Sequence, residues 1–266
     1  MNDGLVVADM GGLEAALAAT EERVDAALKA TAAVTRELKK AKTGAERGQL
    51  RDLRRALSAA TALAGDAVRA STEAAESFSF DEKEYLASGS YAQELLETAT
   101  AQDVAMFEAD ERLLCYPSLI KVLPGDAVVE IDRRREKRLR PSVLLGLLAA
   151  TQARPPRFRP EPFLESLESG YHLVRSQGKH RDAAVVRLLD VWGVLTLLPG
   201  QQRDYTRAEF ARDLYLLDSS AVATAKSGRV LRWHASSGTR SSGTLATVAQ
   251  TGQRQLYWGI SFADRS

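Results

Sequence analysis

One short run holds a dense group of positive charges. From Arg133 to Arg140 the sequence has six Lys and Arg residues and one Glu, and three more arginines follow a short apolar stretch. Six to nine contacts from such side chains to phosphates give steeply salt-dependent nucleic-acid binding. The pattern predicts a phosphate-binding surface made of Arg133, Arg134, Arg135, Lys137, Arg138, Arg140, Arg154, Arg157 and Arg159. The alternative is a solvated connection neutralised by acidic residues between positions 73 and 84.

The C-terminal third has an element order that resembles the winged helix-turn-helix. Thr206 and Glu209 have the spacing of a capping box and predict a helix start. The resemblance implies a supporting helix over 182–197, a second helix over 206–214, a recognition helix over 219–226 and a wing after Gly228. The side chains expected to meet DNA are Ser219, Ser220, Thr224, Lys226, Arg229, Arg232 and Arg240. An ordinary α+β domain, with helices that merely back a sheet, is the alternative.

Three carboxylates are the best candidates for catalysis. Asp126, Glu130 and Asp132 lie on or beside a predicted strand, where Glu130 and Asp132 share a face if the strand alternates. Paired carboxylates hold Mg²⁺ for phosphodiester cleavage, with Lys137 as a charge stabiliser. The arrangement resembles the restriction-endonuclease-like core, although Asp132 stands where that core has lysine. A Mg²⁺-dependent nuclease is therefore the third interpretation.

Other residue types suited to chemistry are sparse. His172, His180 and His234 lack the spacing of metal ligands, and Cys115 is the only cysteine. We therefore expect no enzyme, no metal site, no cofactor and no disulfide.

Residues 13–76 contain no Pro, Trp, Tyr or Phe and are rich in Ala, Glu, Lys and Arg, a composition typical of helices. One apolar stripe predicts a first helix, and a second stripe with heptad spacing predicts another. Glycines in the segment 42–48 allow the chain to reverse. The sequence predicts an antiparallel helical hairpin with stripes at Leu17, Thr20, Val24, Ala27, Leu28, Thr31, Val34 and Leu38, then at Leu50, Leu53, Leu57, Ala60, Ala64 and Ala67.

An alanine-rich stripe brings helices close together but buries little area. We therefore expect residues 13–76 to need a partner. That partner is a second copy of the arm, another protein, or the rest of this chain.

The remaining segments predict a mixed architecture. We expect a helix over 90–114, a β-hairpin over 113–132 around Pro124, a short helix over 142–150 and a proline-rich linker over 154–160. Helices over 161–175 and 179–192, and a short segment over 219–225, precede strands near 230–233, 245–248 and 256–262. The predicted domains are a hairpin over 1–80, a helix and β-hairpin module over 81–153, and a winged-helix-like domain over 154–266.

Composition limits the classes of protein. Lys and Arg total 36 against 35 Asp and Glu, so global charge gives no argument for nucleic-acid binding. The longest apolar runs are far shorter than the roughly 20 residues that span a bilayer. The acidic N-terminus lacks the positive region of a secretory signal. We expect a cytoplasmic protein that does not bind membranes.

Together these patterns predict the α+β class. The first functional hypothesis is a non-enzymatic, nucleic-acid-associated accessory protein that assembles as a homo-oligomer or with a partner protein through residues 13–76. A structural adaptor that binds only protein is the alternative.

Overall fold

The computed structural model describes residues 12–109, 112–154, 156–177, 184–235 and 243–264. The fold is α+β, as predicted, and the chain forms two compact units. Among the described residues, the hairpin unit contains those within 12–98, 123–128 and 137–144, and the sheet unit contains those within 99–122, 129–136 and 145–264. Two short segments from the middle of the chain therefore belong with the N-terminal helices.

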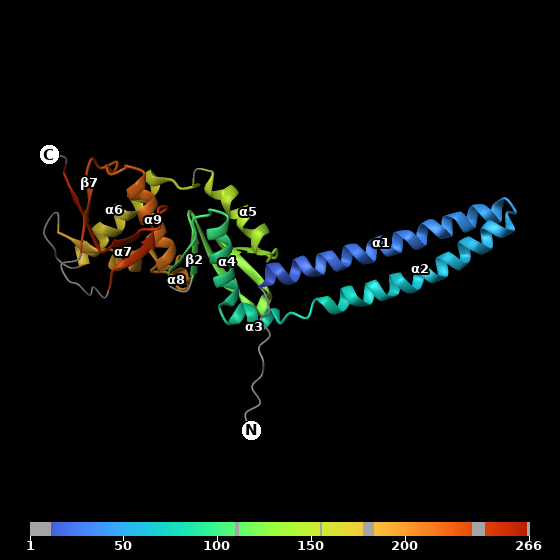
Figure 1. Ribbon diagram of the computed structural model, residues 1–266. Helices are drawn as coiled ribbons and strands as arrows, with labels where there is room; N and C mark the ends of the chain where they lie inside the picture. Colours follow the sequence, from blue (N-terminus) through green and yellow to red (C-terminus); the bar gives the residue numbers. More distant parts are fainter. Residues whose placement is uncertain (1–11, 110–111, 155, 178–183, 236–242, 265–266) are drawn as a thin grey trace, which may run out of the picture. The chain divides into compact units, whose positions relative to one another are not determined.

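Two long helices dominate the hairpin unit. Helix α1 (Leu13–Glu46) and helix α2 (Leu50–Ser77) lie side by side in opposite directions (Figure 1). The chain reverses between them at Gly48, whose φ of 68° is easy for glycine and costly for other residues. This arrangement confirms the predicted helical hairpin. The remaining elements of the unit are α3 (Glu82–Ala87), the start of α4 (Ser90–Ala101), η1 (Pro124–Asp126) and the start of α5 (Pro141–Gln152).

The base of the hairpin is fixed by one carboxylate. Helix α1 begins after Gly12, which has no side chain to cap it, and Glu94 of α4 accepts hydrogen bonds from the N–H groups of Leu13 and Glu14 at 2.9 Å. Tyr85 donates a third hydrogen bond to Glu94 at 3.0 Å. A negative charge at a helix N-terminus satisfies free N–H groups and complements the helix dipole. Glu94 therefore does the work of an N-cap from another helix.

A five-stranded antiparallel meander opens the sheet unit. Its strands follow chain order: β1 (Phe107–Ala109), β2 (Arg112–Cys115), β3 (Ser118–Leu123), β4 (Val128–Ile131) and β5 (Arg134–Glu136). Strands β3 and β4 around η1 confirm the hairpin predicted at Pro124. The helix predicted over 90–114 is wrong beyond Ala101, because Asp103 has a positive φ of 56° and the chain turns into β1.

The rest of the sheet unit combines helices with two small sheets. A three-stranded sheet has the order β6-β10-β7, and β8 pairs with β9. The elements are α6 (Pro160–Gln177), β6 (Val186–Arg187), α7 (Leu188–Leu195), α8 (Gln201–Asp204), α9 (Arg207–Ser219), β7 (Val230–His234), β8 (Leu245–Val248), β9 (Arg254–Tyr257) and β10 (Gly259–Ala263).

The core of this region joins α6, α7 and α9 to the three-stranded sheet. Phe210, Tyr171 and Phe262 are fully buried at its centre, and Figure 1 places their elements together. The helix predicted over 179–192 is wrong at residues 186–187, which pair with β10 as β6, so α7 begins only at Leu188. Within the described residues, no helix is long and apolar enough to cross a membrane.

Candidate functional site

Small residues form the contact between α1 and α2. Ala41 and Gly44 of α1 are buried, as are Ala56, Ala60 and Ala74 of α2. A Cβ added at Gly44 would lie 3.1 Å from the backbone nitrogen of Leu53, so the two helices approach closely here. The contact leaves little room for large side chains.

The large aliphatic side chains of the hairpin lie mostly outside this contact. Leu28 is 62% exposed and Val68 67% exposed. Leu38, Leu57 and Val24 are also exposed. Each predicted stripe therefore merges two neighbouring stripes, one that packs between the helices and one that faces solvent. Alanine and glycine fill much of the contact, so Val24, Leu28 and Leu38 stay at the surface.

Heptad geometry places the exposed aliphatics on one flank. The buried and half-buried residues recur every seven positions from Leu13 to Ala41 and from Leu53 to Ala74. In an antiparallel pair, the e positions of both helices lie on the same side of that contact. Thr31 of α1 accordingly lines one shallow pocket with Val68 and Ser71 of α2. We define the uncharged face as Val24, Leu28, Thr31, Thr35 and Leu38 with Leu57, Thr61, Ala64, Val68, Ser71 and Ala75.

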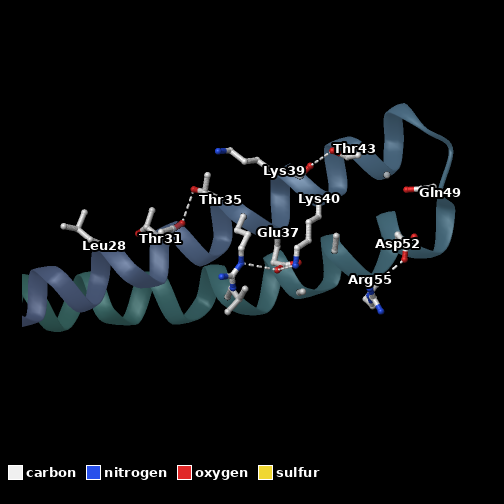
Figure 2. A pocket seen from close by; sticks show the side chains of 16 residues that line it. Leu28, Thr31, Thr35, Glu37, Lys39, Lys40, Thr43, Gln49, Asp52 and Arg55 are labelled. Atoms are coloured by element: carbon white, nitrogen blue, oxygen red, sulfur yellow. Dashed lines mark hydrogen bonds and ion pairs between the residues drawn. The ribbon is translucent and has the colours of Figure 1, made fainter.

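The opposite flank of the hairpin is charged. Figure 2 shows a pocket that residues of this flank line together with Leu28, Thr31 and Thr35 of the uncharged face. In it, Lys40 donates to Glu37 at 2.7 Å and Arg55 lies beside Asp52. The pair of Arg55 with Asp52 is solvated and contributes little to stability, whereas the side chain of Glu37 is only 12% exposed. The charged flank comprises Glu22, Lys29, Arg36, Lys40, Asp52, Arg55, Asp66, Arg69, Glu73 and Glu76.

Every hydroxyl group on the uncharged face already has an acceptor within its own helix. Thr31 donates to the carbonyl of Ala27 at 2.9 Å. Thr35 donates to the carbonyl of Thr31 at 3.0 Å (Figure 2). Thr61 and Ser71 make the same contact with the residue four positions earlier, at 3.1 and 2.8 Å. Burying a polar group that lacks a hydrogen-bond partner is costly. These hydroxyl groups already have a partner in their own helix, so a protein that covers them does not have to supply one. The face presents methyl groups and aliphatic side chains and is ready to be covered.

Arg133, the first residue of the predicted phosphate surface, is bound to a carboxylate of the same chain. Asp132 and Arg133 have φ values of 46° and 68° and form the two-residue turn between β4 and β5. Nε and Nη2 of Arg133 each donate a hydrogen bond to the Glu209 carboxylate at 2.7 Å. A bidentate pair of this kind is among the strongest side-chain contacts. Arg133 therefore holds α9 against the meander.

The contact with Arg133 shifts the pKa of Glu209. Burial raises the pKa of Glu209, but hydrogen bonds from Arg133 and from Thr206 outweigh burial and lower that pKa to about 2. Thr206 and Glu209 also form the capping box that the sequence predicted at the start of α9. Glu209 thus caps its helix and pairs with Arg133 at the same time.

Arg140 is likewise bound to carboxylates. It pairs with Glu14 at 2.7 Å and Glu21 at 2.5 Å, within the hairpin unit. Lys137 and Arg138 belong to this unit and are exposed, whereas the sheet unit holds the exposed Arg134, Arg135, Arg154, Arg157 and Arg159. The cationic run is thus divided between two units, and its Arg133 and Arg140 are bound to carboxylates.

The predicted recognition helix over 219–226 is wrong. Ser219 ends α9, and the Ser220 hydroxyl donates back to the carbonyl of Leu217 at 2.7 Å. The serine pair therefore terminates a helix instead of starting one, and Ala221 follows with a positive φ of 58°. The backbone N–H of Lys226 donates to Glu165, and Thr224 forms an isolated bridge with Val230.

The described wing residues, Arg229 and Arg232, differ in their surroundings. Arg229 pairs with Asp264 at 3.4 Å, and Arg232 is exposed on β7. Arg240 lies outside the described residues.

The predicted metal ligands do not converge. Asp126 lies in the hairpin unit, whereas Glu130 and Asp132 lie in the sheet unit. Asp132 has left the strand, accepts from the N–H of Leu119 at 3.1 Å and pairs with Arg212 at 2.8 Å. The described residues contain no group of three or more His, Cys, Asp and Glu side chains able to hold a metal ion. Burial raises the pKa of Cys115 to about 12, which disfavours a reactive thiolate.

Comparison of the sequence with protein-family models, with curated proteins and with solved structures finds no match. The class that the fold defines is an α+β protein with an N-terminal helical hairpin. The two predicted stripes contain six of the eleven residues of the uncharged face, together with residues that pack between the helices. These six are Val24, Leu28, Thr31, Leu38, Leu57 and Ala64. The signal that separates them is the seven-residue recurrence of small residues, which marks the packed side.

Proposed function

We propose that this protein is a non-catalytic structural adaptor that binds protein through the uncharged face of its hairpin. The observation that carries the proposal is a run of eleven surface positions without a charge, in which every hydroxyl is already hydrogen-bonded. Exposed apolar patches of this kind mark interaction surfaces. The single buried cysteine suits a reducing compartment, so we place the adaptor in the cytoplasm.

The sheet unit supports the same proposal. The order α6, β6, α7, α9, β7 and β10, with the sheet order β6-β10-β7, resembles a winged helix in which α9 takes the recognition position. This helix is covered by its own chain. Arg133 binds Glu209, Asp132 binds Arg212, and the ring of Tyr116 lies 5.4 Å from that of Tyr215. A helix held in this way has no free face for the major groove of DNA.

Site-specific photo-cross-linking tests the adaptor function. A photoreactive amino acid replaces Leu57 on the uncharged face in one variant, and Arg55 on the charged flank in the control. We expect a discrete protein adduct in cells from position 57 and none from position 55. Equal labelling from both positions, or none from either, would refute the proposed docking face.

Nucleic-acid binding is the second candidate function. It is favoured by three exposed arginines in the connection between α5 and α6, Arg154, Arg157 and Arg159. Fluorescence anisotropy with duplex and single-stranded DNA, from about 50 to 200 mM salt, tests it. The adaptor predicts no affinity across this series. Steep salt-dependent binding that is lost when Arg154, Arg157 and Arg159 become Glu would replace the adaptor with a nucleic-acid-associated protein.

A further inference from the structure

Charge is distributed unevenly along the hairpin. The tip half, residues 29–68, has nine Lys and Arg against four Asp and Glu. The base half, residues 13–28 and 69–77, has two Arg against six Asp and Glu. Counted over the two helices, the hairpin is therefore positive at its tip and negative at its base, where Arg140 pairs with two of the six carboxylates, Glu14 and Glu21. A partner that fits along its whole length needs the opposite gradient.

A second copy of this chain has the required gradient when it runs in the opposite direction. Placed antiparallel, the positive tip of each hairpin lies over the negative base of the other. Placed parallel, tip meets tip and base meets base, so like charges face each other. Complementary potentials favour the antiparallel orientation, and like-charge contacts oppose the parallel one.

The uncharged face is also symmetric in this arrangement. Three contacts set the levels of the two helices: Gly44 lies against Leu53, Arg23 pairs with Glu73, and Ser77 donates to Thr20. These contacts place Thr31 of α1 at the same height along the hairpin as residues 66–67 of α2. This height is near the middle of the uncharged face on both helices. Val24 and Leu38 lie seven residues to either side of Thr31. A two-fold axis through that level brings Val24 of one copy over Leu38 of the other.

We propose that the uncharged face binds a second copy of the same chain, and that the two hairpins pack face to face and antiparallel as a four-helix bundle. This inference rests on the proposed function, because it names the partner of the docking face. The interface is isologous, so one surface serves both copies. Helix α1 packs on α1 of the second copy, and α2 packs on α2.

The area suits a stable dimer. The 34 residues of α1 give an arm of about 50 Å at 1.5 Å per residue, and two adjacent helices are about 20 Å wide. Full overlap of the arms then covers roughly 1,000 Å² on each copy, compared with about 800 Å² in a standard protein interface. The uncharged face is about 25 Å long and supplies about half of that area, and the charged ends of the arms supply the rest. Without the partner, the aliphatic side chains from Val24 to Val68 stay in water.

Light scattering on the full chain tests the stoichiometry. One chain has a mass of 29.0 kDa, so the dimer gives about 58 kDa. We expect the dimer at about 10 μM. A mass of 29 kDa at concentrations up to about 100 μM would overturn the second copy as partner. The photo-cross-linking result would then separate the two claims, because an adduct with a different protein leaves the adaptor function standing.

Disulfide cross-linking tests the orientation. In a Cys115→Ala background, a Val24→Cys chain is mixed with a Leu38→Cys chain under mild oxidation. The antiparallel bundle predicts a cross-linked dimer from the mixture and little from either chain alone, because like positions lie about 20 Å apart. The control mixture pairs Leu38→Cys with Thr61→Cys, two positions at similar levels on different helices. Cross-linking in the control mixture alone would show the parallel arrangement and overturn the proposal.

Discussion

The hairpin and the C-terminal part of the sheet unit bury different kinds of residue. In the sheet unit, large side chains such as Phe210, Tyr171 and Leu164 are fully buried. In the hairpin, alanine and glycine are buried, while Leu28 and Val68 are exposed. Large apolar side chains thus build a self-sufficient core in one region and an available surface in the other. The apolar content of a segment is therefore a poor guide to whether the segment is complete by itself.

The largest expected effect is in the sheet unit. Phe210→Ala removes a fully buried ring and should lower the free energy of unfolding by about 3–5 kcal/mol. Leu28→Ala, the matched change on the exposed face, should alter the free energy of unfolding of the isolated chain by less than about 0.5 kcal/mol. Tryptophan fluorescence in a urea titration reports the first, since all three tryptophans lie after residue 190. Far-UV circular dichroism reports the second, and equal losses would remove the contrast between the regions.

The second effect concerns the salt bridge between the meander and α9. The pKa of Glu209 in the folded protein is about 2, below its ordinary value of 4.5. Because the folded pKa is depressed, the stabilisation is present above about pH 4.5 and is lost as the pH falls towards 2. Glu209→Gln should cost about 1–3 kcal/mol at pH 7 and reduce the fall in stability between these pH values. The exposed Glu161→Gln serves as control and should retain the wild-type acid profile in urea titrations.

The third effect arises from close packing in the hairpin. Ala60 is buried between the helices, so Ala60→Leu should destabilise the hairpin by about 1–3 kcal/mol through overpacking. Ala62→Leu, two residues away and exposed, should have almost no effect on the chain. Thermal unfolding followed at 222 nm measures both changes. A stabilised Ala60→Leu variant would mean that the helices have room for larger side chains.

The smallest effect is at the base of the hairpin. A Cβ at Gly12 would lie 2.1 Å from the Glu94 carboxylate, so Gly12→Ala should displace the group that caps α1. The expected cost is about 1 kcal/mol, in the range of a lost N-cap. Hydrogen exchange should accelerate at the amides of Leu13 and Glu14 while the middle of α1 keeps its protection. Unchanged exchange at both amides would show that Glu94 does not determine the start of the helix.

Local signals in the sequence predicted those parts of the fold that local chemistry determines. Thr206 and Glu209 placed the start of α9, and Pro124 placed the turn between β3 and β4. The glycines near residue 48 placed the reversal of the hairpin. In each case, a few neighbouring residues determine the backbone conformation.

The predictions that failed depended on contacts distant in sequence. Ser219 and Ser220 have the composition of an N-cap, but the helix before them continues to Ser219 because its buried face packs into the core. Arg133 has the composition of a phosphate ligand, but Glu209, 76 residues away, binds it. The uncharged face was visible as apolar residues, yet periodicity alone did not tell which stripe packs inward. Such assignments require the three-dimensional arrangement.

Sedimentation of charge variants tests the central claim most directly. Leu28→Glu with Leu38→Glu places two charges on the uncharged face, and Ala26→Glu with Ala62→Glu places two charges on exposed positions of the other flank. We predict that the wild type and the second pair sediment as dimers and that the first pair sediments as a monomer with unchanged helical content. A dimer of unchanged affinity in the first pair would contradict the account.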